Sequence, residues 1–280
     1  MARTDTLGNF LTDVAEAIRT KEGTTETIPA SEFDTRISNL SGGGSSEEKY
    51  APRWISFYRY PGTDLDYELE NLDTSNITSL RGMFAHTTGI TTVNLNHFNL
   101  SQITRMSELF YYSGIKSLDL SNANTSEVTT INAMFYGSSI ESLNVQGWNI
   151  SNVTDMAHMF NYAQNVIELD LSGLNTSKVT TLENAFSNMI RLTKLNLSGW
   201  DTSSITATLN MFSNTKNLTT LIIDSPTVFK LANSSSLTNS AISNGTCTIY
   251  VPDDLVNSYK SANYWSSYPN QIKGLSELPE

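Results

Sequence analysis

Four tyrosines are the side chains best suited to contact a ligand. Tyr111, Tyr112, Tyr136 and Tyr162 each follow a regularly spaced phenylalanine by one or two residues, so neighbouring repeats bring them to one edge. Exposed aromatic rings stack on sugars and anchor protein interfaces. The spacing therefore predicts an aromatic binding edge, although an ordinary surface rich in tyrosine would show the same pattern.

A second set of polar residues lies beside short pairs of apolar residues. The members taken as candidates for ligand binding are Asp119, Asn144, Asp170 and Asn196. Because side chains alternate across a strand, these residues face outward when the apolar residues beside them face inward. Such a hydrogen-bonding face suits a glycan or a polar protein surface, and a plain solvated face would look identical.

No residues match a catalytic or metal-binding pattern. The histidines His86, His97 and His158 fall at different phases of the repeat, so we expect them not to converge. The sequence contains no HExxH, no GxSxG and no glycine loop for phosphate. The acidic run at residues 64–73 matches no EF-hand loop and suits a solvated edge, and Cys247, the only cysteine, suits a buried strand. We therefore expect no enzymatic activity, no cofactor and no metal.

The charge and hydropathy of the chain exclude two classes of partner. The formal net charge is −11, and nucleic-acid binding needs a basic surface that displaces counterions from phosphates. No stretch approaches the roughly 18 apolar residues of a membrane-spanning helix. The first residues lack the basic and apolar regions of a secretory signal, so we expect a protein that is made and stays in a cytoplasm.

A repeat of 25 or 26 residues determines the expected architecture. It is marked by phenylalanines, by Ser-x-(Ile/Val)-Thr units and by pairs of apolar residues two apart; the phenylalanines are Phe84, Phe110, Phe135, Phe160, Phe186 and Phe212. The apolar pairs predict one short strand per repeat, and the spacing of Val153, Met156, Met159 and Phe160 predicts a short helix or helical turn opposite it. We therefore predict an α/β solenoid, a right-handed, parallel coil similar to leucine-rich repeats. A column with aromatic members, which includes Trp148 and Trp200, is expected to stack ring on ring, each followed by a turn-forming Asp or Asn.

The sequence divides into five segments. Residues 1–41 are predicted to form a helical hairpin for anchoring and self-association, 42–50 a flexible linker, 51–68 an N-terminal cap, 69–224 six repeats and 225–280 a C-terminal cap. The apolar residues expected to mediate self-association are Leu11, Val14, Ile18, Phe33 and Ile37. In the C-terminal cap, the residues expected to cover the last repeat are Leu255, Tyr259, Tyr264 and Trp265.

Two segments resemble known families. The units LNVQGWNISNVTDMAHMFNYAQNVIE and LNLSGWDTSSITATLNMFSNTKNLTT resemble BspA-type, or mycoplasma lipoprotein-type, leucine-rich repeats. That resemblance covers residues 69–224 and implies a parallel solenoid of the kind found in surface-exposed adhesion proteins. The segment LTDVAEAIRTKEGTTETIPASEFDTRISNL resembles a short N-terminal module of structural proteins of tailed phages.

The two resemblances together lead to a hypothesis of function. We expect a phage virion protein that is assembled in the host cytoplasm, with other virion proteins and copies of itself as partners. Its repeats would bind a glycan or a protein on the host surface, without nucleic-acid binding or membrane insertion. The alternative is an exported bacterial cell-surface adhesin of the same repeat family. A virion hydrolase would need a carboxylate pair or a nucleophile that the sequence does not offer.

Overall fold

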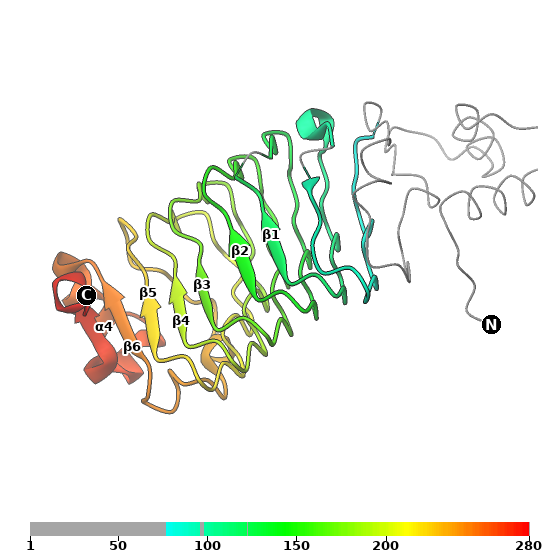
Figure 1. Cartoon of the computed structure of the whole chain (residues 1–280). Helices are drawn as coiled ribbons and strands as arrows, with labels where there is room; N and C mark the ends of the chain where they lie inside the picture. Colours follow the sequence, from blue (N-terminus) through cyan, green and yellow to red (C-terminus); the bar gives the residue numbers. More distant parts are fainter. Residues whose placement is uncertain (1–76, 96–97, 122, 280) are drawn as a thin grey trace, which may run out of the picture.

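The computed structural model describes residues 77–95, 98–121 and 123–279. The expected helical hairpin, the linker and the N-terminal cap lie outside these residues, as do Leu11, Val14, Ile18, Phe33 and Ile37. Within the described part, the chain winds through successive coils that stack side by side along one axis (Figure 1). None of the helices in this part is long and apolar enough to cross a membrane.

Short parallel strands line one side of the stack. They are β1 (Ser117–Asp119), β2 (Ser142–Asn144), β3 (Glu168–Asp170), β4 (Lys194–Asn196), β5 (Thr220–Ile222), β6 (Thr248–Val251) and β7 (Ile272–Gly274). β1 pairs with β2, and β3 to β7 form a second sheet in sequence order (Figure 1). The register joins equivalent residues, such as Leu118 with Leu143 and Leu169 with Leu195. The apolar pair Val93 and Leu95 is buried as predicted. The described residues beside this pair form no strand, and they join the strand side through a bridge between Thr92 and Ser117.

A second parallel ladder runs along another side of the stack. Single bridges connect Ser79, Arg105, Thr130, Asp155, Thr181 and Ala207 in succession. Beside it lies a column of threonines in which each backbone N–H donates to the carbonyl of the preceding threonine; for example, Thr129 N donates to Thr104 O at 2.8 Å. The threonine hydroxyl donates to the same carbonyl, as Thr129 Oγ1 does at 3.1 Å. Each coil is therefore tied to the previous one at the same point.

The helical turn predicted around Val153–Phe160 is replaced by consecutive tight turns. In the coil of Phe110, alternate N–H groups between residues 106 and 113 donate to the next coil. The N–H groups of Leu109, Tyr111 and Ser113 donate to carbonyls three residues earlier in the same coil. An α-helix would instead close every bond four residues back within the segment. The prediction failed because turns of this kind bury residues at the same spacing as a helix: Met156, Met159 and Phe160 are fully buried.

The repeated phenylalanines form a continuous column through the interior. Consecutive rings are stacked nearly parallel, with interplanar angles of 7° to 11° and centroids 5.3 to 6.1 Å apart from Phe84 to Phe212. All are fully buried, and burying one such side chain contributes about 1.5–3 kcal/mol. The periodic core predicted from the sequence is confirmed.

The column that contains Trp148 and Trp200 is buried but does not stack ring on ring. Phe98 meets Phe84 edge-on at 6.3 Å between ring centroids, and Trp200 lies 6.4 Å from Phe186. The small or aliphatic members Ala123 and Leu174 separate the rings of this column, so Phe98 and Trp200 pack against the phenylalanine column instead. The polar residues that follow do form the expected turns, each accepting a backbone N–H two residues on, as in Asn149 with Ser151.

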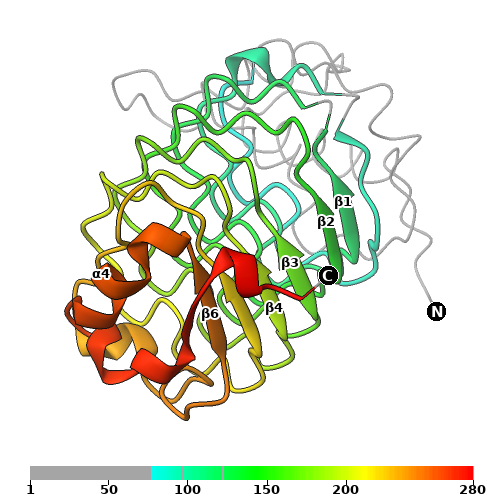
Figure 2. The same cartoon turned by 90° about the vertical axis from the view of Figure 1, so that its left-hand side faces the viewer.

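Most helices of the described part lie at the C-terminal end of the stack. The one α-helix among the described residues, α4 (Val256–Ser261), follows β6 and lies at the end of the stack (Figure 2). Tyr259 and Trp265 are buried there, and both bond to one residue: Phe229 N donates to Tyr259 Oη and Trp265 Nε1 donates to Phe229 O. Short 3-10 helices complete the described part: η3 (Leu100–Gln102), η4 (Ser234–Leu237), η5 (Asp253–Leu255), η6 (Trp265–Ser267), η7 (Pro269–Gln271) and η8 (Leu275–Glu277).

Stacking continues past residue 224, where the sequence repeats become irregular. Phe212 N donates to Ser236 O and Asn214 N donates to Thr238 O, so residues after 224 add a further coil. A ladder of side-chain amides crosses the same coils. Asn188 donates to Asn161, Asn214 to Asn188 and Asn239 to Asn214, at 3.0, 2.9 and 3.1 Å.

Candidate functional site

The four tyrosines singled out in the sequence do share one edge of the stack. Tyr111 stacks on Tyr136 with centroids 5.0 Å apart, Tyr112 meets Tyr111 at 4.8 Å, and Tyr162 lies 5.7 Å from Tyr136. Tyr112 and Tyr162 are 43% and 42% exposed, whereas Tyr111 and Tyr136 are half-buried. The cluster therefore offers two rings to solvent and uses the other two to hold them in place.

The two histidines that the structure describes contact this cluster through different tyrosines, and no ring contact joins them to each other within the described residues. His86 stacks on Tyr112 with centroids 5.6 Å apart and an interplanar angle of 12°, and His158 lies 6.3 Å from Tyr136. His86 lies two residues after its phenylalanine and His158 two residues before, and turns on adjacent coils bring both positions to the same edge. We call the six rings the aromatic edge: His86, Tyr111, Tyr112, Tyr136, His158 and Tyr162.

Backbone geometry explains why the rings project here. His86, Tyr112 and Tyr162 have φ between +49° and +61°, an arrangement that tight turns require at particular positions. Their N–H groups donate to the next coil: His86 N donates to Tyr111 O and Tyr112 N to Tyr136 O, at 2.8 and 2.7 Å. The backbone that carries each ring is therefore held by hydrogen bonds to the next coil. In later coils the equivalent positions are held by Asn188 and Asn214, which adopt this φ readily.

The environment of the edge raises the pKa of two of its phenols, Tyr111 and Tyr136. Burial raises the pKa of Tyr136 to about 12, and the neighbouring phenols of Tyr112, Tyr111 and Tyr162 add to this. Burial also raises the pKa of Tyr111, followed by the effects of Tyr112 and Glu108. Neutral phenols can donate and accept hydrogen bonds, which suits a ligand rich in hydroxyl or amide groups.

A polar groove lies beside the aromatic edge. It has a volume of about 460 Å³ and is lined by residues of four consecutive coils: Arg81, Thr104, Arg105, Ser107, Glu108, Thr129, Thr130, Asn132, Thr154 and Asp155. Two cations and two carboxylates in this lining balance one another. We call this hollow the polar groove.

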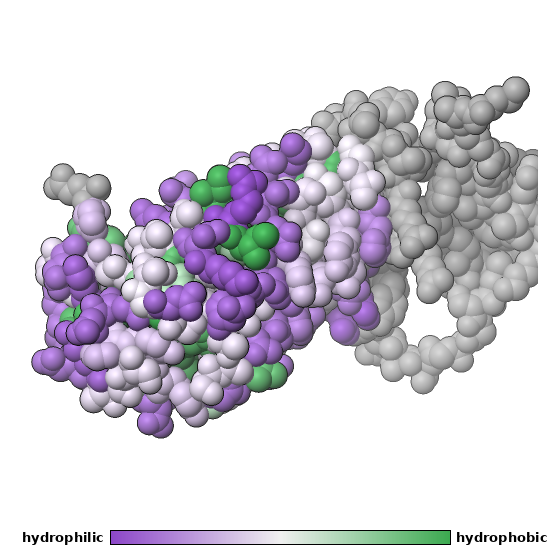
Figure 3. Space-filling model, turned by 90° about the horizontal axis from the view of Figure 1, so that it is seen from below, coloured by the Kyte–Doolittle hydropathy of each residue, from purple (hydrophilic) through white to green (hydrophobic). Residues whose placement is uncertain are grey.

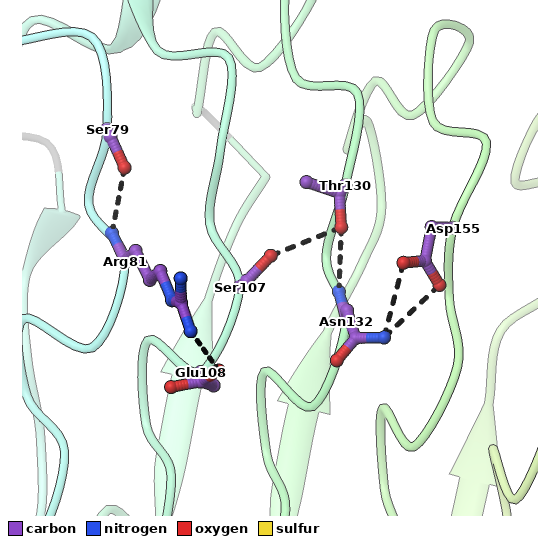
Figure 4. A network of polar contacts seen from close by, with 7 residues as sticks. All are labelled: Ser79, Arg81, Ser107, Glu108, Thr130, Asn132 and Asp155. Atoms are coloured by element: carbon purple, nitrogen blue, oxygen red, sulfur yellow. Dashed lines mark hydrogen bonds and ion pairs between the residues drawn. The ribbon is translucent and has the colours of Figure 1, made fainter. Parts of the chain in front are cut away.

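Hydrogen bonds organise the groove (Figure 4). Arg81 Nη2 lies 2.9 Å from Glu108 Oε1, and Asn132 Nδ2 donates to both carboxylate oxygens of Asp155 at 3.3 and 3.2 Å. The hydroxyls of Ser107 and Thr130 are 3.1 Å apart. These bonds cross from coil to coil, so they hold polar side chains in fixed positions along the stack.

Glu108 joins the groove to the aromatic edge. Its carboxylate lines the groove, and its charge is one cause of the raised pKa of Tyr111. Sequence reasoning missed the groove. An available signal was the position three residues before each phenylalanine, which holds Arg81, Ser107 and Asn132 in successive repeats.

The repeats match a protein family described as Mycoplasma protein of unknown function, DUF285, over residues 57–146 and 137–245. The chain belongs to this family. The match supports the resemblance to mycoplasma-type repeats, and it includes the aromatic edge and the polar groove of this DUF285 protein. No curated protein matches the chain.

The polar strand residues of this DUF285 protein form a separate network. Asp119, Asn144, Asp170 and Asn196 each accept the backbone N–H two residues on, at 2.8 to 3.1 Å. Asn144 Nδ2 also donates to Asp119 Oδ1 at 3.0 Å. The hydrogen bond from the Ser121 N–H is the main cause of the lowered pKa of Asp119. Burial raises the pKa of Asp170, but bonds from Ser172 and Asn196 and the charge of Lys194 lower it overall. These side chains shape the turns after the strands.

Other reactive groups of this DUF285 protein are held in structural positions. Cys247 is buried, as predicted, and burial raises the pKa of its thiol to about 12, so it stays protonated at neutral pH. Within residues 77–95, 98–121 and 123–279, the His, Cys, Asp and Glu side chains form no group of three that could hold a metal ion.

Figure 3 shows one face of the stack, where hydrophilic residues predominate and hydrophobic ones form small separate patches.

Proposed function

We propose that this chain is a binding and display protein without catalytic activity, and that the aromatic edge is its contact surface. The single observation that carries this proposal is the aromatic edge itself: rings from consecutive coils fix one another and leave Tyr112 and Tyr162 exposed. Rigid, partly exposed aromatic side chains give large contact areas at low entropic cost, which is the property of interface anchors.

We also propose the finer architecture that the sequence predicted. The stacked coils form a right-handed solenoid related to leucine-rich repeats, and the parallel strands with their equal register support this assignment. A solenoid presents a long surface on which each coil can vary without disturbing its neighbours. Such a scaffold suits attachment to a host surface through a glycan or a protein.

Our first proposal for its location is the phage virion, anchored through residues 1–41. The support is the resemblance of this segment to structural proteins of tailed phages. The second candidate is an exported adhesin on a bacterial cell, which the name of the matched family favours because it refers to Mycoplasma. Electron microscopy with antibody to this chain distinguishes the two: label on purified phage particles supports the first, and label on intact uninfected cells supports the second.

Binding through the aromatic edge is tested with a double variant. Tyr112→Asn with Tyr162→Asn removes both exposed rings and retains a residue type that occurs at the equivalent positions Asn188 and Asn214. We expect attachment of the labelled full chain to host cells to fall at least tenfold. Leu209→Asn is the matched control, because Leu209 is 39% exposed and lies outside the edge. Equal attachment by the double variant and the control would contradict the proposal.

A further inference from the structure

We propose that the polar groove binds a neutral, linear oligosaccharide that lies along the stack, with sugar rings packed against the aromatic edge. This inference rests on the proposed function, because it names the ligand class for the same surface. It follows from three features of the groove: the balance of its charges, the repetition of its hydroxyls and its continuity with the tyrosines.

The lining of the groove favours a ligand that is polar and carries no net charge. Arg81 and Arg105 are matched by Glu108 and Asp155, so the groove carries no net charge that would favour an ion. Its hydroxyl, amide and carboxylate groups disfavour an apolar ligand, which cannot replace the water bound to them. Sugar hydroxyls both donate and accept hydrogen bonds, so they can satisfy this mixture of groups.

Specific oxygen atoms are available to such a ligand. Glu108 Oε1 takes the bond from Arg81, which leaves its second oxygen for another donor. The side-chain nitrogen of Asn132 is used by Asp155, and its amide oxygen has no hydrogen bond among the contacts of the described residues. Both residues line the groove, so they offer two acceptors on adjacent coils to which the hydroxyls of a sugar could donate.

The repetition of the hydroxyls favours a sugar chain over a peptide. Thr104, Thr129 and Thr154 are exposed at the same point of three successive coils. Paired strands of neighbouring coils are about 4.8 Å apart, a step comparable to one pyranose residue of a linear polysaccharide. An extended peptide repeats its same-facing side chains every ~6.6 Å, so it would lose register with the coils within two steps.

The aromatic edge supplies the second half of a carbohydrate site. The carbon–hydrogen face of a sugar packs on an aromatic ring, while its hydroxyls need polar partners at the side. Glu108 lines the groove and its carbonyl accepts the Tyr111 N–H at 3.0 Å, so the groove adjoins the aromatic edge and one chain can reach both surfaces. The exposed rings of Tyr112 and Tyr162 lie on coils that also contribute to, or adjoin, the groove.

The test measures binding of the full chain to a panel of neutral hexasaccharides by titration calorimetry. The panel contains β-1,4-linked glucose, β-1,4-linked N-acetylglucosamine, β-1,3-linked glucose and α-1,4-linked glucose, with hexagalacturonate as the acidic comparison. We expect at least one neutral hexasaccharide to bind, and Thr129→Val and Asn132→Ala to weaken it about tenfold each.

Matched controls separate binding from folding. Thr206→Val removes the same kind of hydroxyl bond, from Thr206 Oγ1 to Thr180 O, outside the groove. Glu183→Ala changes the position equivalent to Asn132 two coils further on. Both controls are expected to change sugar affinity less than twofold.

Three outcomes would overturn the inference: no neutral sugar binds at millimolar concentration, the groove variants bind as well as the controls, or hexagalacturonate binds more tightly than every neutral sugar. If host-cell attachment still depends on Tyr112 and Tyr162 in those cases, the proposed function stands and the glycan assignment alone is wrong. If attachment is also independent of the tyrosines, both are wrong.

Discussion

Gly137 leaves open the space that the ring of Tyr112 occupies: a Cβ on Gly137 would lie 2.6 Å from Tyr112 Cε1. Gly137 also has a φ of +61°, at the position where the coils on either side carry Tyr112 and Tyr162. The absence of a side chain at Gly137 therefore lets the Tyr112 ring of the preceding coil lie against the Gly137 backbone.

Gly137→Ala should displace the Tyr112 ring and destabilise the fold by about 1–2 kcal/mol through backbone strain, with a further loss from the clash. Host-cell attachment should fall with it. Gly173→Ala is the control, because Gly173 has a φ of +75° and nothing within 4 Å of an added Cβ. Urea unfolding of both variants measures the difference. Equal destabilisation would show that the contact with Tyr112 contributes nothing.

Trp148 and Trp200 occupy equivalent positions but differ in one hydrogen bond. Trp200 Nε1 donates to Leu171 O at 2.8 Å, whereas the buried Trp148 Nε1 has no partner among the described residues. Trp200→Phe should therefore cost about 1 kcal/mol more in unfolding free energy than Trp148→Phe, since it alone leaves a carbonyl unpaired. Thermal unfolding of the two variants side by side checks this, and the reverse order would refute it.

The amide ladder predicts a pH-dependent variant. Asn188→Asp removes the nitrogen that donates to Asn161 and places a carboxylate oxygen against Asn161 Oδ1. At neutral pH we expect a loss of about 1–3 kcal/mol. The folded-state pKa of the new carboxyl is raised, because its protonated form can donate in place of the lost amide. The loss should therefore shrink as the pH falls below the folded-state pKa.

Asn175→Asp provides the matched control for the ladder variant. Asn175 Oδ1 only accepts, from Ser177 N and Ser177 Oγ, and the next coil has Asp201 at the equivalent position. This variant should be as stable as the original chain at neutral pH. Unfolding curves recorded at several pH values distinguish the two substitutions, and parallel pH profiles would contradict the role of the ladder.

The phenols predict a loss of stability in strong alkali. Burial raises the pKa of Tyr136 to about 12, and burial raises that of Tyr259 to about 12 as well. Between pH 10 and 12 the unfolded chain therefore loses these phenol protons while the folded protein keeps them. The contribution of the two phenols to the free energy of unfolding is fully present below the ordinary pKa of 10.0. It falls as the pH rises from 10 to 12. Tyrosinate absorbance should show both late titrations, and Tyr136→Phe should remove one; a titration curve unchanged by that substitution would contradict the assignment.

Self-association through the N-terminal segment is a prediction from sequence alone. Leu11→Asp with Ile18→Asp places two charges on the apolar stripe, and we expect the resulting desolvation cost to dissociate an oligomer of the full chain. Thr12→Asp, off the stripe, is the control. Sedimentation velocity measures the mass, and an unchanged mass in the double variant would exclude this role for the stripe.

The sequence predicted the periodic core because burial leaves a strong and simple pattern. The phenylalanines and the leucines of β3 and β4 recur at one interval, and only stacked coils bury them all. The turns that replace the expected helix could not be recognised from Val153, Met156, Met159 and Phe160, since both structures bury that spacing. Their signature is positive φ at residues such as Glu108 and Ala133, which are not typical of that conformation.

The binding surface was predicted less completely than the core. The tyrosines were found because exposed rings at related positions are conspicuous. The contacts between the histidines and the tyrosines were missed, as was the groove, because both depend on how adjacent coils bring different repeat positions together. Asp119 and Asn144 were chosen for their polarity, yet their oxygens accept backbone N–H groups of the turns. A short polar side chain after a strand serves this local purpose readily.

Each coil offers its neighbour the same carbonyls and N–H groups, as the unbroken threonine column shows. Duplication or deletion of one unit in the gene would therefore preserve this pattern of hydrogen bonds between coils. The distance between an anchored end and the tyrosines could change by whole units in this way, without redesign of either part. Recombination can then adjust the distance from the anchored end to the tyrosines by changing the number of repeat units.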